Sequence, residues 1–355
     1  MIDPITGALL AGVATLVGYL SEHVITCLVP AFFIAGAIGA FVKKDAILKY
    51  FSPDTKKTVS YGIASVSGTV LAVCSCTILP MFAGIYKKGS GIGPAVTFLY
   101  AGPAINVLAI IYTAKVLGFD LGVARALAAV ALAIVIGLIM AAIFRDHDAG
   151  VRAAAPARAA RAEEGGRPWW ATLAFFASLV GILVFGASQL PWTIKFPIVY
   201  LLTLAVAVLV IYTFERDEVT DWAYETWDLT KKIFPILIAG TFVLGMLAYF
   251  LPPETFAPYF GDNSIGATLL AAIVGGILYM PTLLEVPIIG TTFGYTSGVM
   301  AGGPALALLL AGPSVSLPSL LVISRVMGAK KTAVYAVLVI LFSALAGFVY
   351  GNIVG

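Results

Sequence analysis

Residues 58–90 read TVSYGIASVSGTVLAVCSCTILPMFAGIYKKGS, and this apolar stretch decides the fold. It is 33 residues long, which is too long for one helical membrane crossing of about 20 residues and too short for two crossings plus a turn. The cluster Cys74-Ser75-Cys76-Thr77-Ile78-Leu79-Pro80 lies near its middle. Because proline removes a backbone donor and ends a helix, the stretch predicts a re-entrant hairpin whose two half-helices enter and leave on the same side.

The composition of the whole chain indicates that lipid is its solvent. Of 355 residues, 61% are hydrophobic and 11% are charged, against roughly 25% charged in a soluble domain. The mean hydropathy is +1.02. A chain this apolar cannot cover a water-facing surface, which excludes a soluble enzyme, a nucleic-acid binder and a disordered scaffold. With 2 His and 3 Cys, neither a His-rich metal site nor a disulfide framework is expected, and no cofactor is predicted.

A second stretch, 265–297, has the same length and its own breaker cluster between Pro281 and Pro287, so it predicts a second hairpin. The remaining apolar runs predict about nine full spans. These are 5–21, 24–42, 92–114, 120–144, 170–188, 197–214, 233–251, 303–324 and 331–353.

The distribution of Lys and Arg predicts which side each segment faces. With the N-terminus and both ends of the first hairpin in the cytoplasm, all basic residues fall on the cytoplasmic side except Lys115, Arg125 and Lys195. The segments that flank the second hairpin, 252–264 and 298–302, contain neither Lys nor Arg, so that hairpin enters from outside. A single crossing by the first stretch stays open as an alternative, because the rule is a bias.

The two halves of the chain resemble each other. Ala101-Gly102-Pro103 recurs as Ala311-Gly312-Pro313, and matching Pro80 to Pro287 aligns the hairpins. Chance similarity between Ala- and Gly-rich segments is the alternative. The predicted fold class is an all-α polytopic membrane protein with two inverted five-element repeats, each containing a re-entrant hairpin and a Gly-Pro-broken helix. Its parts are repeat one (1–144), a basic cytoplasmic linker (145–169), a connecting span (170–190) and repeat two (191–355).

Interrupted helices in a membrane predict a binding site. Unsatisfied backbone in hydrocarbon costs several kcal/mol, so it persists only where it is buried in protein or lines a wet cavity. Two hairpin tips and two Gly-Pro breaks would converge near the midplane, as in secondary transporters. Repair of the helix breaks is the alternative role for Asn106 and Ser316. The predicted substrate-binding residues are Cys74, Ser75, Cys76, Gly102, Pro103, Asn106, Pro281, Thr282, Gly312, Pro313 and Ser316.

Cys74 and Cys76 indicate the chemistry of the solute. Thiolates prefer soft species such as trivalent arsenic, which would be a substrate bound by this pair rather than a resident metal. Both thiols could instead only pack in a helix, and Cys27 has no motif around it. Glu285 is the one acid expected deep in the membrane and is a candidate for proton coupling; a structural hydrogen bond to hairpin backbone is its alternative role.

The segments Cys-Ser-Cys-Thr-Ile-Leu-Pro (74–80), Lys-Lys-Gly (87–89) and Phe-Leu-Tyr-Ala-Gly-Pro-Ala-Ile-Asn (98–106) resemble the signature of the ArsP-type predicted permeases. The resemblance covers most of the chain, and it implies a multi-pass permease of the cell (inner) membrane that exports trivalent organoarsenicals through membrane cysteines. No G-x-x-x-x-G-K-[ST] loop is present, so secondary transport by alternating access is expected, not enzymatic catalysis. A small-molecule substrate and the lipid bilayer are the expected partners, and nucleic acid is not. A permease for another solute, such as a sulfur compound, and a membrane thiol-disulfide oxidoreductase remain the alternatives.

Overall fold

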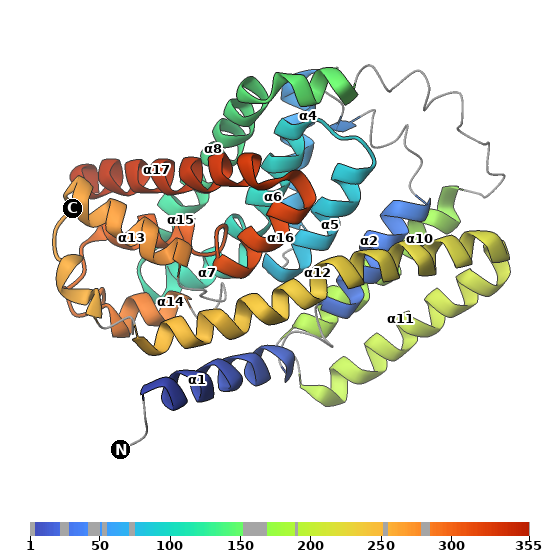
Figure 1. Ribbon diagram of the computed structural model, residues 1–355, viewed down its shortest axis with the longest axis horizontal. Coiled ribbons are helices and arrows are strands. Elements are labelled where there is room, and N and C mark those ends of the chain that lie inside the picture. The colour runs from blue at the N-terminus through green and yellow to red at the C-terminus, as the bar shows by residue number, and fades with distance from the viewer. Residues whose placement is uncertain are drawn as a thin grey trace.

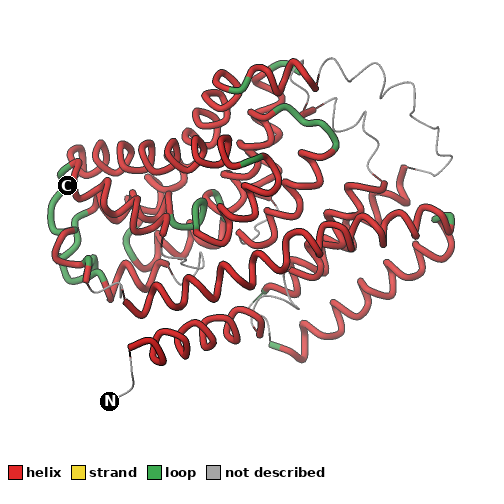
Figure 2. The backbone as a smooth tube through the Cα atoms, viewed as in Figure 1, coloured by secondary structure: helices red, strands yellow, loops and turns green. Residues whose placement is uncertain are grey.

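The computed structural model describes residues 4–21, 28–41, 50–51, 55–70, 75–151, 169–188, 191–250, 255–277 and 285–354. Every regular element in these ranges is a helix, and none is a strand (Figures 1 and 2). Helices satisfy their own backbone donors and acceptors, which is what lipid demands of a spanning segment. The predicted all-helical class is therefore confirmed.

The elements follow one another in two series. The first comprises α1 (Pro4–Tyr19), α2 (Val29–Phe41), α4 (Lys57–Val70), α5 (Ser75–Lys87), α6 (Ile92–Ala104), α7 (Val107–Val116) and α8 (Phe119–Ile143). The second comprises α10 (Trp169–Ala187), α11 (Trp192–Thr213), α12 (Arg216–Phe250), the 3-10 turn η3 (Ala257–Tyr259), α13 (Ile265–Ile277), α14 (Glu285–Pro287), the π-helical turn η4 (Ile288–Thr292), α15 (Gly302–Ala311), α16 (Leu317–Met327) and α17 (Ala329–Val354).

Within the described residues, four helices are long and apolar enough to cross a membrane: α8, α11, α12 and α17. The bent pair of α6 and α7 would add a fifth span. The helices at the other predicted spans, α1, α2, α10 and the pair α15–α16, are apolar but shorter. In 58–90 the described helices are α4, to Val70, and α5, from Ser75; in 265–297 they include α13, to Ile277, and α14, from Glu285. The connecting residues 71–74 and 278–284 lie outside the described ranges.

Helices α6 and α15 form the centre of the molecule. Every residue of α6 is buried, as is every residue of α15 after Gly302. A helix that is apolar all round belongs in such a core. Glycines let the neighbouring helices approach closely: a Cβ on Gly137 of α8 would lie 2.8 Å from the carbonyl oxygen of Gly93, and a Cβ on Gly347 of α17 would meet that of Gly303. Small residues at such crossings are typical of membrane helix packing.

Helix α12 covers one flank of this core and runs as one element from Arg216, well before the predicted span 233–251 (Figure 1). It packs against α1, α2 and α16. Helix α11 packs against α10, and only 6% of its apolar 18-residue segment is buried inside the protein. Large apolar side chains such as Leu201 and Ile211 are exposed there, at 64% and 73%. A contiguous exposed apolar face is expected where lipid covers the protein.

Candidate functional site

One of the two predicted sulfur ligands, Cys76, belongs to α5. This helix begins at Ser75, so Ser75 and Cys76 occupy its first turn, although their side chains are outside the described part of the structure. Cys74 and Cys27 are outside it altogether, as are Pro281 and Thr282 on the second hairpin. The pairing of Cys74 with Cys76 around one solute therefore stays a prediction.

The first predicted break is present. Pro103 lies in the last turn of α6, and the axes of Ile92–Ala104 and Ala109–Val116 are inclined by 42°. Asn106 stands between the two pieces and is buried, and its Oδ1 accepts a hydrogen bond of 3.3 Å from the backbone N–H of Ala109. This bond satisfies a donor freed by the break, which is the repair role considered for Asn106.

The second predicted break is also present. Helix α15 ends at Ala311, Gly312 and Pro313 turn the chain, and α16 begins after Ser316. The Ser316 hydroxyl caps α16 by accepting from the backbone N–H of Ser319 at 3.4 Å, and it donates to the Ser319 hydroxyl at 2.8 Å. Ser316 therefore repairs its break, as Asn106 does.

Each break is contacted by the second arm of one apolar stretch, which is α5 in 58–90 and α14 in 265–297. A Cβ on Gly102 would lie 2.7 Å from Cδ1 of Ile78 in α5. A Cβ on Gly312 would lie 2.7 Å from Oε1 of Glu285 in α14. The packing of these arms is crossed, since α5 also contacts α16 and α14 also contacts α7. The two broken helices and the second arms of the two stretches thus meet in one region.

A buried ion pair connects the two halves in this region. The Nη2 of Arg125 in α8 lies 3.3 Å from Oε2 of Glu285, and both side chains are 0% exposed. The Nη1 of Arg125 donates to the Thr113 hydroxyl of α7 at 2.9 Å. Among the described residues, neither Oε1 of Glu285 nor Nε of Arg125 has a hydrogen-bond partner.

Charge counting places Arg125 among the three basic residues that are not cytoplasmic, and the structure shows that its side chain is buried in the protein interior. The charge rule counts loop residues, and Arg125 is inside the predicted span 120–144. An ionisable residue inside a span is itself a signal for a buried partner, and that signal could have identified Arg125. The alternative role for Glu285 is a hydrogen bond to hairpin backbone. Among its described contacts, its hydrogen-bond partner is instead this guanidinium.

A second polar cluster joins the last turn of α5 and the first turn of α17 with the helical residues 145–151 that follow α8. The Lys331 Nζ donates to the Tyr86 hydroxyl at 2.9 Å and lies 3.2 Å from Nδ1 of His147, whose ring stacks on that of Tyr86 with centroids 5.0 Å apart. Burial, and then the charge of Lys331, lowers the pKa of His147. Beside this cluster, Lys87 Nζ lies 2.7 Å from Asp228 Oδ2 and so connects α5 with α12.

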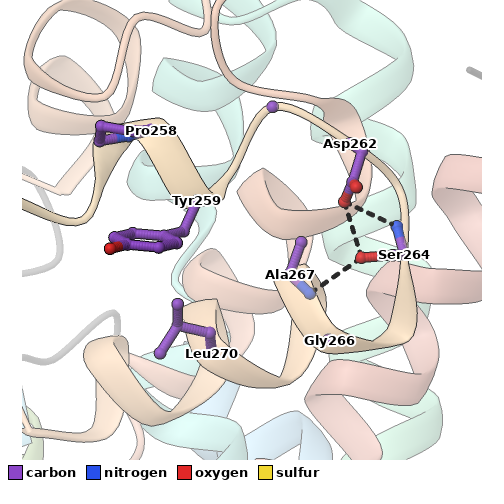
Figure 3. A pocket seen from close by; sticks show the side chains of 8 residues that line it. Pro258, Tyr259, Asp262, Ser264, Gly266, Ala267 and Leu270 are labelled. Carbon is purple, nitrogen blue, oxygen red and sulfur yellow. Dashed lines mark hydrogen bonds between the residues drawn. The ribbon is translucent and has the colours of Figure 1, made fainter.

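A surface hollow of about 370 Å³ lies before α13 and is separate from the breaks. Asp262 accepts bonds from the backbone and hydroxyl of Ser264 at 3.1 and 2.7 Å, and the Ser264 hydroxyl accepts from the backbone of Ala267, as Figure 3 shows. The neighbouring Asn263 accepts from the backbone N–H of Gly303, at the end of α15 opposite its break. These bonds cap the local chain, so the hollow carries no part of the site.

The apolar exposed shell, the all-helical core and the two interrupted helices define a polytopic helical membrane protein. Residues 9–352 match the model of a family described as "predicted permease", and the chain belongs to that family. It is 43% identical to the UPF0718 protein MJ0584 of Methanocaldococcus jannaschii over 351 residues, covering 96% of this chain and 94% of that protein. It is 23% identical to the UPF0718 protein YraQ of Escherichia coli K12 over 281 residues, covering 79% and 63%. No solved structure matches.

Proposed function

We propose that the chain is a secondary transporter of the cell membrane that exports a small thiophilic solute, with trivalent organoarsenicals as the substrate class. Membership of a predicted permease family supports transport in general. The observation that carries the proposal is the meeting of both second arms with both helix breaks, at Ile78 on Gly102 and Glu285 on Gly312. In secondary transporters such interrupted backbone forms the solute site.

An inverted repeat with a cytoplasmic N-terminus is part of the proposal. Several glycines of the first half recur in the second half at one constant interval: Gly93 and Gly303, Gly102 and Gly312, Gly118 and Gly328, Gly137 and Gly347. Their surroundings recur as well. Gly118 and Gly328 both have positive φ before a long helix, and Gly137 and Gly347 both face the first turns of a central helix. The crossed packing, α5 on α16 and α14 on α7, has the same symmetry.

The opposite orientation of the two halves can be tested by labelling. Single cysteines introduced by Lys88→Cys and by Thr296→Cys, in a chain without its native cysteines, should react with impermeant thiol reagents from opposite sides of the membrane. Right-side-out and everted vesicles provide the two arms. Labelling of both positions from the same side would contradict the inverted repeat.

Cys74 and Cys76 are the proposed ligands of the solute. A trivalent organoarsenical with two hydroxyl groups can form two As–S bonds with two thiols and release two water molecules, so no oxidant is required. Soft sulfur ligands suit this element. Cys76 lies in the first turn of α5, whose residue Ile78 contacts the first break at Gly102.

The test is efflux of methylarsenite from cells and its uptake by everted vesicles. Cys74→Ser with Cys76→Ser should abolish transport, while Cys27→Ser is the matched control and should retain it. Unchanged methylarsenite transport in the double variant removes the sulfur ligands from the mechanism. If that variant instead alters the cellular thiol-disulfide balance and leaves transport alone, the oxidoreductase alternative is favoured; transport of a sulfur compound by both forms favours the other permease.

Glu285 is the proposed proton-coupling residue. An ionisable side chain buried in the membrane core is a functional candidate because its burial is costly. In vesicles with an imposed pH gradient, Glu285→Gln should uncouple solute flux from the gradient. A variant whose flux keeps the wild-type dependence on the gradient would remove Glu285 from this role.

A further inference from the structure

The guanidinium of Arg125 is held by few partners for a charge that is entirely buried. Its Nη2 faces Glu285 Oε2 at 3.3 Å, and its Nη1 donates to the Thr113 hydroxyl, which itself donates to the carbonyl of Ala109 at 2.7 Å. Guanidinium carries five N–H donors in a rigid fork that can grip an oxyanion in two places. Here the contact with the carboxylate uses one nitrogen, and Nε has no partner among the described residues.

The surroundings of the pair contain no second full charge that acts on it in the described structure. The carboxylate of Glu285 interacts electrostatically with Arg125. One further described titratable group acts on Arg125, the Tyr100 hydroxyl of α6, which donates to the carbonyl of Leu310. Tyr335 of α17, on which Tyr100 acts, donates to the carbonyl of Ser314 at 3.2 Å.

The other elements described here that pack against α14 contribute no charge that acts on the pair. Helix α7 packs against it and carries Tyr112 and Lys115, neither of which acts on the carboxylate, and η4 (Ile288–Thr292) has no ionisable side chain. Among the groups that the structure describes, Arg125 and Glu285 therefore neutralise only each other.

This isolation has a consequence for proton binding. A buried charge is tolerated only when it is paired, and arginine stays protonated under all physiological conditions. If Glu285 accepts a proton, Arg125 loses its counter-charge. The site then needs a replacement anion, and the guanidinium is the group that would bind it.

We infer that Arg125 is an anion-binding residue that exchanges partners: it binds ionised Glu285 in the empty site, and it binds a negatively charged group of the solute once Glu285 carries a proton. This inference rests on the proposed permease function and narrows its substrate class to thiophilic solutes with an anionic group. One proton and one negative charge enter together, so the local charge is zero in both states. No covalent bond changes at Arg125 or Glu285.

Helix α6 contacts both the helix that carries Cys76 and the charge pair. Tyr100 and Gly102 lie two residues apart on α6 and therefore face nearly opposite sides of that helix. Gly102 contacts Ile78, two residues after Cys76, while Tyr100 adjoins the charge pair. Both the helix that carries Cys76 and the charge pair therefore adjoin the broken end of α6, where the solute site is proposed.

The test uses the full chain in detergent and two matched probes, phenylarsine oxide and 4-carboxyphenylarsine oxide, which differ by one carboxylate. Affinity is measured by calorimetry, and proton uptake by an indicator dye in weakly buffered solution at neutral pH. In the wild type the carboxylated probe should take up about one proton more than the neutral probe. Glu285→Gln should bind the carboxylated probe without that uptake. The neutral double variant Arg125→Gln/Glu285→Gln should bind the carboxylated probe about tenfold or more weakly, with affinity for the neutral probe retained.

The outcomes separate the two proposals. If the neutral probe binds but the carboxylated probe brings no additional proton to the wild type, the partner exchange is wrong and the permease proposal stands. The same holds if the double variant binds both probes as the wild type does. If neither probe binds, the proposed substrate class fails, and the anion inference fails with it. The wild-type proton count needs no substitution, so a variant that does not fold cannot obscure the result.

Discussion

Removal of one member of the buried pair should cost far more stability than removal of both. At the observed separation of 3.3 Å, and with an effective dielectric constant of about 20, the Coulomb attraction between Arg125 and Glu285 is about 5 kcal/mol. Much of that attraction offsets the desolvation of two side chains that are both 0% exposed. Single truncations of buried pairs cost about 3–5 kcal/mol, whereas uncharged replacement of both partners is often close to neutral.

The two single variants should differ from each other in their response to pH. In Arg125→Gln, the orphaned Glu285 carboxylate can accept a proton and so escape the penalty, and the loss of stability should shrink as pH is lowered. In Glu285→Gln, the orphaned guanidinium stays charged, so its penalty of about 3–5 kcal/mol should persist across the pH range. The double variant should be more stable than Glu285→Gln at every pH.

The measurement is a double-mutant cycle on the free energy of unfolding, by titration with dodecyl sulfate in mixed micelles and tryptophan fluorescence. A coupling energy near 3 kcal/mol is expected for groups in direct contact. Additive effects, within about 0.5 kcal/mol, would refute the reasoning, because they would show that the two charges do not compensate each other. Equal pH profiles for the two single variants would refute the account of which charge can be neutralised.

Three further outcomes are expected. Gly137→Ala should destabilise the protein by about 1–3 kcal/mol because its Cβ would press on the backbone of α6. Gly62 faces open space, so Gly62→Ala should stabilise the protein by up to about 1 kcal/mol. The same titration measures both variants, and equal effects would contradict the close helix crossing. The side chains of Lys87 and Asp228 are 40% and 33% exposed. Their coupling energy in a double-mutant cycle should therefore stay below about 1 kcal/mol and shrink at high salt. A coupling energy that does not depend on salt would show that the pair is desolvated. Burial first, and then a neighbouring lysine, lowers the pKa of His147, so unfolded histidine gains its proton before the folded form does. Stability should therefore fall as pH drops below 6.5, and His147→Gln should flatten that fall unless another group causes it.

The location of the helix interruptions could be predicted from sequence because their causes are local. Proline and glycine act through the backbone of their own segment, so Pro103 and Gly312 mark breaks that the structure places within a residue or two. Apolar length likewise located α8, α11 and α17, which are long enough to cross a membrane. The start of α12 at Arg216 escaped prediction because its first turns are polar, and a length criterion counts only the apolar part of a helix.

The partner of Glu285 could not be predicted by local reasoning. Arg125 is 160 residues away in the chain, and the contact depends on how α8 and α14 pack. Charge counting assigns a side of the membrane to a loop and contains no information about the rotation of a helix. What the sequence does contain is a lone arginine within an apolar run, which alone demands a counter-charge. With Glu285 as the one acid predicted deep in the membrane, the pairing was accessible in principle.

Under the proposed repeat, the two breaks are alike in backbone and different in chemistry. Matching Pro80 to Pro287 sets Ile78 opposite Glu285, and these two side chains make the same contact, each with the glycine of a break. The interval that relates Gly102 to Gly312 also relates Arg125 to Tyr335, so the first break has neither member of the charge pair at its equivalent positions. The second hairpin in turn has no cysteine at the positions that match Cys74 and Cys76. A symmetric scaffold would therefore present sulfur on one side and a charge pair on the other, and only a solute with both a soft atom and an anionic group would use both sides at once.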